Sequence, residues 1–423
     1  MTSTTTAPTE IPQPAHVQRR ILTVLVIAQI LSGAGLAAGI TVGALLAQDM
    51  LGSTGLAGLP SALFTAGSAL AAVAVGRISQ ARGRRPGLAA GYLVGAIGGA
   101  GVIVAALVNN PVVLFLALFV YGAGTATNLQ ARYAGADLAD PAHRGRAVST
   151  VLVATTLGGV VGPNLTSPMG SLAHALGIPR LAGPFILATV AYVAAALVLA
   201  IWLRPDPLRL ARTLETQRAV TDAAPAGDAA EAPQPASTRG RSTGVVLGTM
   251  VMVLTQLVMV AIMTMTPVHM HDHGHTTAAS GLVIAVHIAA MYLPSPLTGR
   301  MADRYGRIKV AAASGVTLLA AGVLAATAPA GSVVLLALAL ALLGLGWNFG
   351  LVAGTAIIAD TVPLETRAKT QGMVDVAIAI AGAAGGLASG LVVAAASFPV
   401  LALTGGVIAL AVLPAIAASA KRR

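Results

Sequence analysis

The chain has 423 residues, of which 56% are hydrophobic and only 9% are charged. Soluble domains carry about 25% charged residues, so this composition excludes a water-soluble protein. The chain has no cysteine, which excludes disulfides and thiolate metal sites. Its formal net charge of +11 comes from short basic clusters between apolar runs. That distribution indicates membrane topology, and we expect no nucleic-acid partner.

Twelve apolar runs are long enough to cross a membrane. A helix needs roughly 20 apolar residues to cross about 30 Å of hydrocarbon. The runs lack the strict alternation of β-barrel strands, so the spans are expected to be helices. We therefore predict an all-α integral membrane protein with spans at 21–47, 57–76, 88–108, 111–131, 146–165, 181–203, 244–266, 276–298, 309–328, 332–357, 372–396 and 399–420.

The segments between these spans divide the chain into four parts. The first residues are polar and lack the charged region and cleavage site of a secretory signal, so the first helix is expected to act as the targeting signal. A central segment rich in Pro, Ala, Asp, Glu and Arg is expected to bury no core and to be a mobile linker. The predicted parts are a tail at 1–20, a six-helix half at 21–203, a linker at 204–243 and a second half at 244–423.

The basic residues predict the orientation of the spans. Of 25 basic residues, only Arg180 lies outside the cytoplasm if the N-terminus is cytoplasmic. The positive-inside rule therefore places both termini in the cytoplasm. Beyond those in the linker and at the C-terminus, the cytoplasmic clusters contain Arg19, Arg20, Arg77, Arg82, Arg84, Arg85, Arg132, Arg144, Arg146, Arg300, Arg304, Arg307, Lys309, Arg367 and Lys369.

A loop motif occurs once in each half. After the second span the chain reads Gly76-Arg77-Ile78-Ser79-Gln80-Ala81-Arg82-Gly83-Arg84-Arg85. After the eighth span it reads Gly299-Arg300-Met301-Ala302-Asp303-Arg304-Tyr305-Gly306-Arg307. With the span count and the central linker, these loops resemble the G-x-x-x-D-R-x-G-R signature of the major facilitator superfamily. The resemblance implies two pseudo-symmetric six-helix halves in a bacterial cytoplasmic membrane. It also implies alternating access and a solute site between the halves. No enzymatic activity is expected, because the sequence shows no nucleophile–base pair or phosphate-binding loop.

The loop residues are candidates for controlling conformational change. Glycines let helix ends approach closely, and Asp303 can bond a helix N-terminus or an arginine of the other half in one conformation. Gln80 replaces the acid in the first copy, so we expect a weaker contact there. Alternatively, the arginines only fix topology. The predicted gating residues are Gly76, Gly83, Arg84, Gly299, Asp303, Arg304, Gly306 and Arg307, and their expected partners lie in two loops that contain Asp137, Arg144, Arg146, Asp360, Glu365 and Arg367.

Soft metal ligands gather in the seventh and eighth spans. The pairs Met259/Met263 and His287/Met291 are each spaced four residues apart, which places both members on one helix face. Thioethers favour Cu(I), and imidazole binds copper in either oxidation state. Alternatively, the methionines fill gaps in apolar packing and the histidine is structural. The loop between the two spans adds a histidine tract, which is either a ligand set or a solvated loop, with His269, His271, His273 and His275.

The paired motifs M-x-x-x-M and H-x-x-x-M resemble those of the CcoA-type copper importers, a bacterial branch of the major facilitator superfamily. The resemblance implies uptake of copper into the cytoplasm as substrate, without a permanently bound cofactor. We expect a ladder from the histidine tract through Met263, Met259, His287 and Met291, because these residues lie at different depths in the membrane. Neighbouring members of that branch are similar to riboflavin transporters.

Two other functions remain open. One is proton-coupled transport of an organic solute, either vitamin uptake or drug efflux. The other is a metal-binding receptor that transports nothing. Only 3% of residues are aromatic, which disfavours an organic solute. Asp375 is either a proton carrier or a partner of Arg367 or Lys369. The expected partners are therefore a copper ion or a small organic solute and the lipid bilayer, with the chain acting as a monomer.

Overall fold

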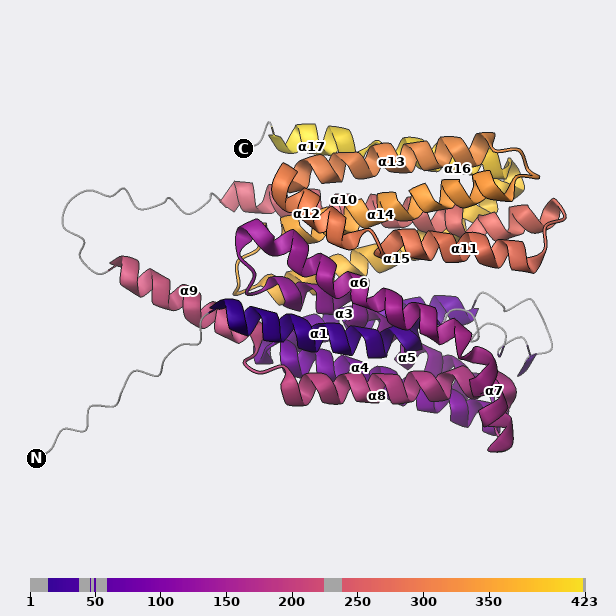
Figure 1. Cartoon of the computed structure of the whole chain (residues 1–423), viewed down its shortest axis with the longest axis horizontal. Helices are drawn as coiled ribbons and strands as arrows, with labels where there is room; N and C mark the ends of the chain where they lie inside the picture. Colours follow the sequence, from indigo (N-terminus) through magenta and orange to yellow (C-terminus); the bar gives the residue numbers. More distant parts are fainter. Residues whose placement is uncertain (1–13, 38–45, 47–48, 51–58, 224–237, 421–423) are drawn as a thin grey trace, which may run out of the picture.

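The computed structural model describes residues 14–37, 46, 49–50, 59–223 and 238–420. The regular elements of these residues are all helices, which lie lengthwise in one elongated bundle (Figure 1). Figure 1 shows two halves, with the N-terminal helices below and the C-terminal helices above. The predicted all-α fold of two halves is confirmed.

The first half crosses the bundle six times. Its core contains the ring of Tyr192, whose centroid lies 5.7 Å from that of Tyr92 and 5.5 Å from that of Tyr121. Short helices connect the long ones near both ends of the bundle. The elements are α1 (Pro14–Ala37), α3 (Leu59–Arg82), α4 (Arg84–Leu107), α5 (Pro111–Ala136), η2 (Pro141–His143), α6 (Arg144–Asn164), α7 (Thr166–Ala175), η3 (Arg180–Ala182) and α8 (Gly183–Trp202).

The second half also crosses six times, but two of its predicted spans are each built from two helices. The span predicted at 276–298 is interrupted around Pro294, because proline cannot donate a helical hydrogen bond. The span predicted at 399–420 is interrupted after Ala409. The elements are α10 (Thr238–Asp272), α11 (Thr277–Tyr292), α12 (Ser295–Tyr305), α13 (Arg307–Thr327), α14 (Val333–Thr361), α15 (Arg367–Ala395), α16 (Phe398–Ala409) and α17 (Val412–Ala420).

Eleven stretches of the described residues have the length and hydropathy of a membrane crossing. The remaining crossing is α6, which packs along α1 and α12. The predicted twelve crossings are therefore present. The two ends of the bundle differ in their side chains. The arginine end carries the two signature loops, and the histidine end carries the connection between α10 and α11 (Figure 1).

Several helices continue beyond the predicted spans, because a helix does not need to stop at the hydrocarbon boundary. The fourth span was predicted to end at residue 131, whereas α5 continues to Ala136. Arg132 was expected in the loop that follows this span. That prediction is wrong, because Arg132 lies inside α5 and is completely buried.

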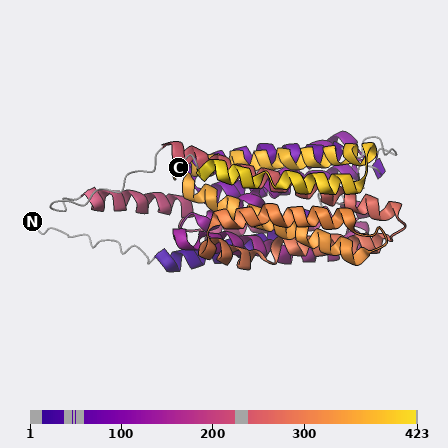
Figure 2. The same ribbon diagram turned by 90° about the horizontal axis from the view of Figure 1, so that it is seen from above.

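The predicted linker contains a helix, α9 (Pro207–Ala223), at the arginine end of the bundle (Figure 2). Asp206 starts this helix by accepting hydrogen bonds from the backbone N–H groups of Leu208 and Arg209, at 3.1 and 3.2 Å. Leu208 and Ala211 are buried. The expectation that the linker buries no core is therefore wrong for α9. Residues 224–237 of the linker, 1–13 of the tail, and 38–45 and 47 of the first predicted span lie outside the described residues.

Candidate functional site

A buried ion pair joins the two halves. Arg132 of α5 donates from Nη2 to Oδ1 of Asp375 in α15, at 2.7 Å. The Tyr133 hydroxyl donates to the same oxygen at 3.2 Å, and Arg132 Nε donates to Oγ1 of Thr355 at 3.1 Å. The other carboxylate oxygen, Oδ2, is buried and has no hydrogen-bond partner among the described residues. This oxygen can accept a proton without displacing an existing bond.

The alternative that Asp375 pairs with Arg367 or Lys369 is wrong. Asp375 lies eight residues after Arg367 in the same helix, which separates the two by about 12 Å along its axis. Its actual partner is Arg132, which was expected in the loop after the fourth predicted span. The run from Asn128 to Ala136 contains no other charged residue, and this signal could have extended the predicted fourth span past Arg132.

A first ion-pair network, defined as Arg84, Asp137 and Arg367, lies closer to the arginine end. Arg84 of α4 donates to Asp137 from Nε at 2.7 Å and from Nη2 at 3.3 Å. Arg84 also donates to the side chain of Gln371 in the other half. Arg367 of α15 lies 4.0 Å from the same aspartate. The Arg84 and Asp137 side chains are only 0% and 1% exposed.

A second ion-pair network, defined as Arg307, Asp360 and Arg144, is its counterpart. Arg307 Nε lies 2.7 Å from Asp360 Oδ2, and Arg144 Nη1 lies 2.6 Å from Oδ1. Arg307 also donates to the carbonyl of Pro141 in the first half. In both networks one aspartate binds an arginine of its own half and an arginine of the other half. The contacts therefore cross between the halves in both directions.

Asp303 of the second signature loop caps a helix of the opposite half. Its two carboxylate oxygens accept hydrogen bonds from the backbone N–H groups of Gly145 and Arg146, at 2.8 and 3.0 Å. These N–H groups lie in the first turn of α6, where a negative charge is stabilised by the helix dipole. Arg304, in contrast, is exposed and lies over the ring of its neighbour Tyr305, 5.4 Å from the centroid.

Gln80 occupies the equivalent position in the first loop. Its Oε1 accepts hydrogen bonds from the N–H groups of Ala368 and Lys369 at 2.8 and 3.3 Å, in the first turn of α15. Its Nε2 donates to the carbonyls of Leu364, at 3.1 Å, and Glu365. Gln80 therefore forms four hydrogen bonds to the other half, because an amide can donate as well as accept. The expected weakness of this contact stays a prediction.

The four signature glycines fall into two pairs. Gly76 lies against Gly372, and Gly299 lies against Gly145, so closely that a Cβ atom on either would collide with the opposite backbone. Gly83 and Gly306 precede α4 and α13 with φ angles of 99° and 96°, which favour glycine. Gly76 and Gly299 thus permit close contact between the halves. Gly83 and Gly306 permit the turns that position Arg84 and Arg307.

The candidate ligands inside the second half are buried among apolar side chains. Met259 of α10 and Met291 of α11 belong to one apolar cluster, and Met263 packs against it. His287 is completely buried, and its Nδ1 lies 2.8 Å from the carbonyl of Leu340 in α14. Its Nε2 is buried and has no partner in the described part of the chain.

The histidine tract lies at the opposite end of the bundle from the arginine networks. The His269 ring stacks on Phe398 with centroids 4.4 Å apart, and His273 Nδ1 lies 2.7 Å from the His269 carbonyl. His275 Nε2 lies 2.7 Å from the carbonyl of Ala330, and His271 is exposed. Within the described ranges, no group of three or more His, Cys, Asp or Glu side chains is close enough to hold a metal ion.

Comparison with known proteins agrees with this architecture. The family model described as Major Facilitator Superfamily matches residues 25–291 and 245–422. This chain belongs to the major facilitator superfamily. Its relatives in the superfamily include the uncharacterized MFS-type transporter YdeG of Bacillus subtilis, which is 56% identical over 94% of this chain and 91% of that protein. The riboflavin transporter RfnT of Brucella anthropi is 30% identical over 85% of this chain and 86% of its own length.

Solved structures show the same superfamily fold. The human organic anion transporter MFSD10 matches with a TM-score of 0.74, covering 94% of this chain and 99% of that chain. The two sequences are 17% identical, so the match shows the fold alone. As a member of this superfamily, the chain is a multi-pass membrane protein of a family of transporters.

Proposed function

We propose that this protein is a secondary transporter of the bacterial cytoplasmic membrane that carries a small solute by alternating access. One observation carries the proposal: hydrogen bonds and ion pairs between the halves gather at the arginine end. The positive-inside rule assigns that end to the cytoplasm. The structure then represents a state closed toward the cytoplasm, and the same bonds must break when the protein opens to that side.

We infer that the solute is a small organic molecule with a planar ring system, of the riboflavin type. The relative RfnT, named a riboflavin transporter, supports this solute class. Tyr292 of α11 and Trp347 of α14 form an edge-to-face pair with centroids 5.6 Å apart, and Trp347 Nε1 donates to Gln256 of α10 at 2.7 Å. Such rings can stack on a planar solute. The low aromatic content of the whole chain is a poor guide here, because a binding site needs only a few rings.

Asp375 is the proposed proton carrier of this transporter. Its free oxygen accepts the proton, and the neutral carboxyl then no longer balances the charge of Arg132. Weakening this pair loosens the contact between α5 and α15. Proton binding and opening toward the cytoplasm are coupled in this way, because both act on one bond between the halves.

Copper is a second candidate solute, and His287 favours it. The Leu340 carbonyl only accepts hydrogen bonds, so His287 Nδ1 carries the hydrogen, which leaves a lone pair on the buried Nε2. Histidine ligands of metals are commonly oriented by such a bond from the other ring nitrogen to a carbonyl. Met291, four residues later in α11, is a soft partner for Cu(I).

Transport into proteoliposomes that contain the purified protein separates the two solutes. With an imposed proton gradient, radiolabelled riboflavin is expected to accumulate, and a protonophore is expected to abolish the accumulation. Asp375→Asn should reduce accumulation to the equilibrium level and retain exchange of labelled for unlabelled solute. Riboflavin that neither accumulates nor exchanges would contradict the organic solute. Uptake of radioactive copper that disappears in His287→Ala would establish copper instead.

A further inference from the structure

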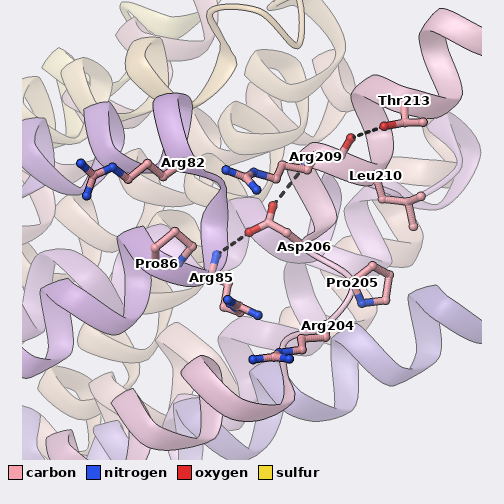
Figure 3. Close-up of a pocket in the computed structure, with 9 residues that line it drawn as sticks. All are labelled: Arg82, Arg85, Pro86, Arg204, Pro205, Asp206, Arg209, Leu210 and Thr213. Carbon is pink, nitrogen blue, oxygen red and sulfur yellow. Dashed lines mark hydrogen bonds between the residues drawn. The ribbon is translucent and has the colours of Figure 1, made fainter.

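A hollow of about 570 Å³ lies at the arginine end, where α9 begins. It is bounded by the turn between α3 and α4, the segment after α8 and the first turns of α9 (Figure 3). Its volume is within the range of binding sites for small molecules. Four of the residues that line it are arginines: Arg82, Arg85, Arg204 and Arg209.

The positive charges of this hollow are only partly balanced by the protein. None of the four guanidinium groups forms a hydrogen bond or an ion pair with another described residue. The one acid in its lining, Asp206, keeps its negative charge and binds backbone N–H groups, so positive charges outnumber negative ones in the hollow by four to one. Its Oδ2 accepts from the N–H of Arg85 at 2.7 Å, and its Oδ1 accepts from Leu208 and Arg209. The hollow therefore has the character of a site for an anion.

The position of the hollow along α8 indicates what kind of anion it meets. The outward face of α8 is apolar up to Ile201, which is strongly exposed. Trp202, which is 52% exposed, ends the helix, and Arg204 follows two residues later. Exposed tryptophans are enriched at the depth of the lipid headgroups. The mouth of the hollow is thus at the level of the phosphate groups of the adjacent leaflet.

The second half repeats the signature loop but not the arginines of the hollow. Aligning the two loops places Tyr305 and Ile308 at the positions of Arg82 and Arg85. Gly83 lies against the Asp206 carboxylate, whereas Gly306 has no described neighbour within 4 Å of an added Cβ. The cluster of arginines is therefore not a by-product of the repeated loop.

We propose that this hollow binds the phosphate group of an anionic phospholipid from the cytoplasmic leaflet. Guanidinium groups bind phosphate oxygens through paired N–H···O bonds, which suits the fork geometry of arginine. The bound headgroup holds together the start of α9 and the turn before α4. Further along α9, Arg212 donates to the carbonyls of Gln80, at 3.1 Å, and Leu364, at 3.2 Å, one in each half. Lipid binding therefore stabilises a helix that bridges the closed arginine end.

The test measures thermal unfolding in nanodiscs of phosphatidylcholine, with and without phosphatidylglycerol. The hollow variant carries Arg85→Gln, Arg204→Gln and Arg209→Gln. A matched control carries Arg77→Gln, Arg300→Gln and Lys309→Gln, which removes three exposed charges near the same end outside the hollow. Phosphatidylglycerol should raise the unfolding temperature of the natural protein and of the control by the same amount. The rise should be lost in the hollow variant, whose affinity for labelled phosphatidylglycerol should fall about ten-fold or more.

Other outcomes decide against the proposal. Equal responses of both variants would mean that the lipid acts only through overall surface charge. An equal stabilisation by inorganic phosphate or ATP in phosphatidylcholine nanodiscs, lost in the hollow variant, would assign the site to a soluble phosphate. If the hollow variant does not fold, the same three positions are changed to lysine. This variant keeps the charges and loses the paired bonds, so it should bind phosphatidylglycerol more weakly than the natural protein. Unchanged binding in the lysine variant would overturn the proposed recognition.

Discussion

The first and second ion-pair networks have the same composition and different surroundings. Each contains one aspartate, an arginine of its own half and an arginine of the other half. In the first network Asp137 is 1% exposed, whereas in the second Asp360 is 30% exposed. The internal repeat therefore fixes which residues pair, and another part of the chain fixes how much water reaches them.

The linker helix α9 explains the difference. Its buried residues Leu208 and Ala211 form an apolar cluster with Leu364 and Ala368, and Leu138, next to Asp137, packs against this cluster. α9 thereby covers the first network, and Asp206, which precedes α9, binds the N–H of Arg85 in the first half. A buried ion pair loses much more free energy than an exposed one when one partner is removed.

The largest expected effect is that of removing Asp137. In Asp137→Ala, Arg84 stays buried without its counter-charge, so the free energy of unfolding should fall by roughly 3–5 kcal/mol. Asp360→Ala is the matched control, and its cost should be about 0–1 kcal/mol because water reaches Arg307 and Arg144. Thermal or denaturant unfolding of the purified variants measures both values. Equal losses would show that the burial of the first network has no energetic consequence.

The two turn glycines test the docking of α9. Both positions have positive φ angles with extended ψ angles, a region that is essentially restricted to glycine, so alanine should cost about 1–3 kcal/mol at either one. At Gly83 the added Cβ would also lie 2.4 Å from Asp206 Oδ2. Gly83→Ala should therefore cost about 1–3 kcal/mol more than Gly306→Ala, because hydrogen bonds of Asp206 are lost.

This docking effect has an internal control. Asp206→Ala should destabilise the natural protein but add little to Gly83→Ala, because both changes remove the same contact. In the Gly306→Ala background, the effect of Asp206→Ala should be fully retained. Proteolysis within α9 offers a second measurement, and Gly83→Ala should make it faster. Additive effects of Gly83→Ala and Asp206→Ala would contradict the proposed role of the glycine.

The smallest effect is expected for the two helix caps. Gln80→Asp keeps the bonds from Ala368 and Lys369 and strengthens them by charge, but loses the donations to the carbonyls of Leu364 and Glu365. These changes oppose each other, so the stability should change by less than about 1 kcal/mol. Asp303→Asn loses the charge and replaces one accepting oxygen with an NH2 group that faces a backbone N–H, so it should destabilise by about 1 kcal/mol. A large increase in the free energy of unfolding in Gln80→Asp would mean that the glutamine is a poor helix cap.

Much of the fold was predictable because it follows from local properties of the chain. Long apolar runs predicted the crossings, and the repeated loop predicted the two halves. Errors arose where helices continue past the hydrocarbon, as at Arg132, or where a polar segment packs on a neighbouring element, as at α9. The hydropathy of a short segment predicts neither the end of a helix nor the packing of a polar segment, because both depend on what the segment contacts.

The candidate site was predictable only in part. The signature loops correctly identified Asp303, Arg84 and Arg307 as residues near the contact between the halves. The two loops expected to hold their partners do so, but the sequence did not show which residues pair. Gln80 was read as a lost acid, although its amide makes a full set of hydrogen bonds. The metal-ligand roles of Met259 and His287 remain predictions. Their side chains lie among apolar neighbours that packing alone also explains.

The sequence by itself determined the membrane environment, the number of crossings and the residues of the two signature loops, because hydrophobicity and repetition are properties of contiguous segments. Only the tertiary structure decided that Arg132 pairs with Asp375 across 243 residues of sequence. It also decided that one of two equivalent ion-pair networks is buried. Both outcomes depend on which helices of opposite halves pack together and on where α9 lies, and no single segment carries that information.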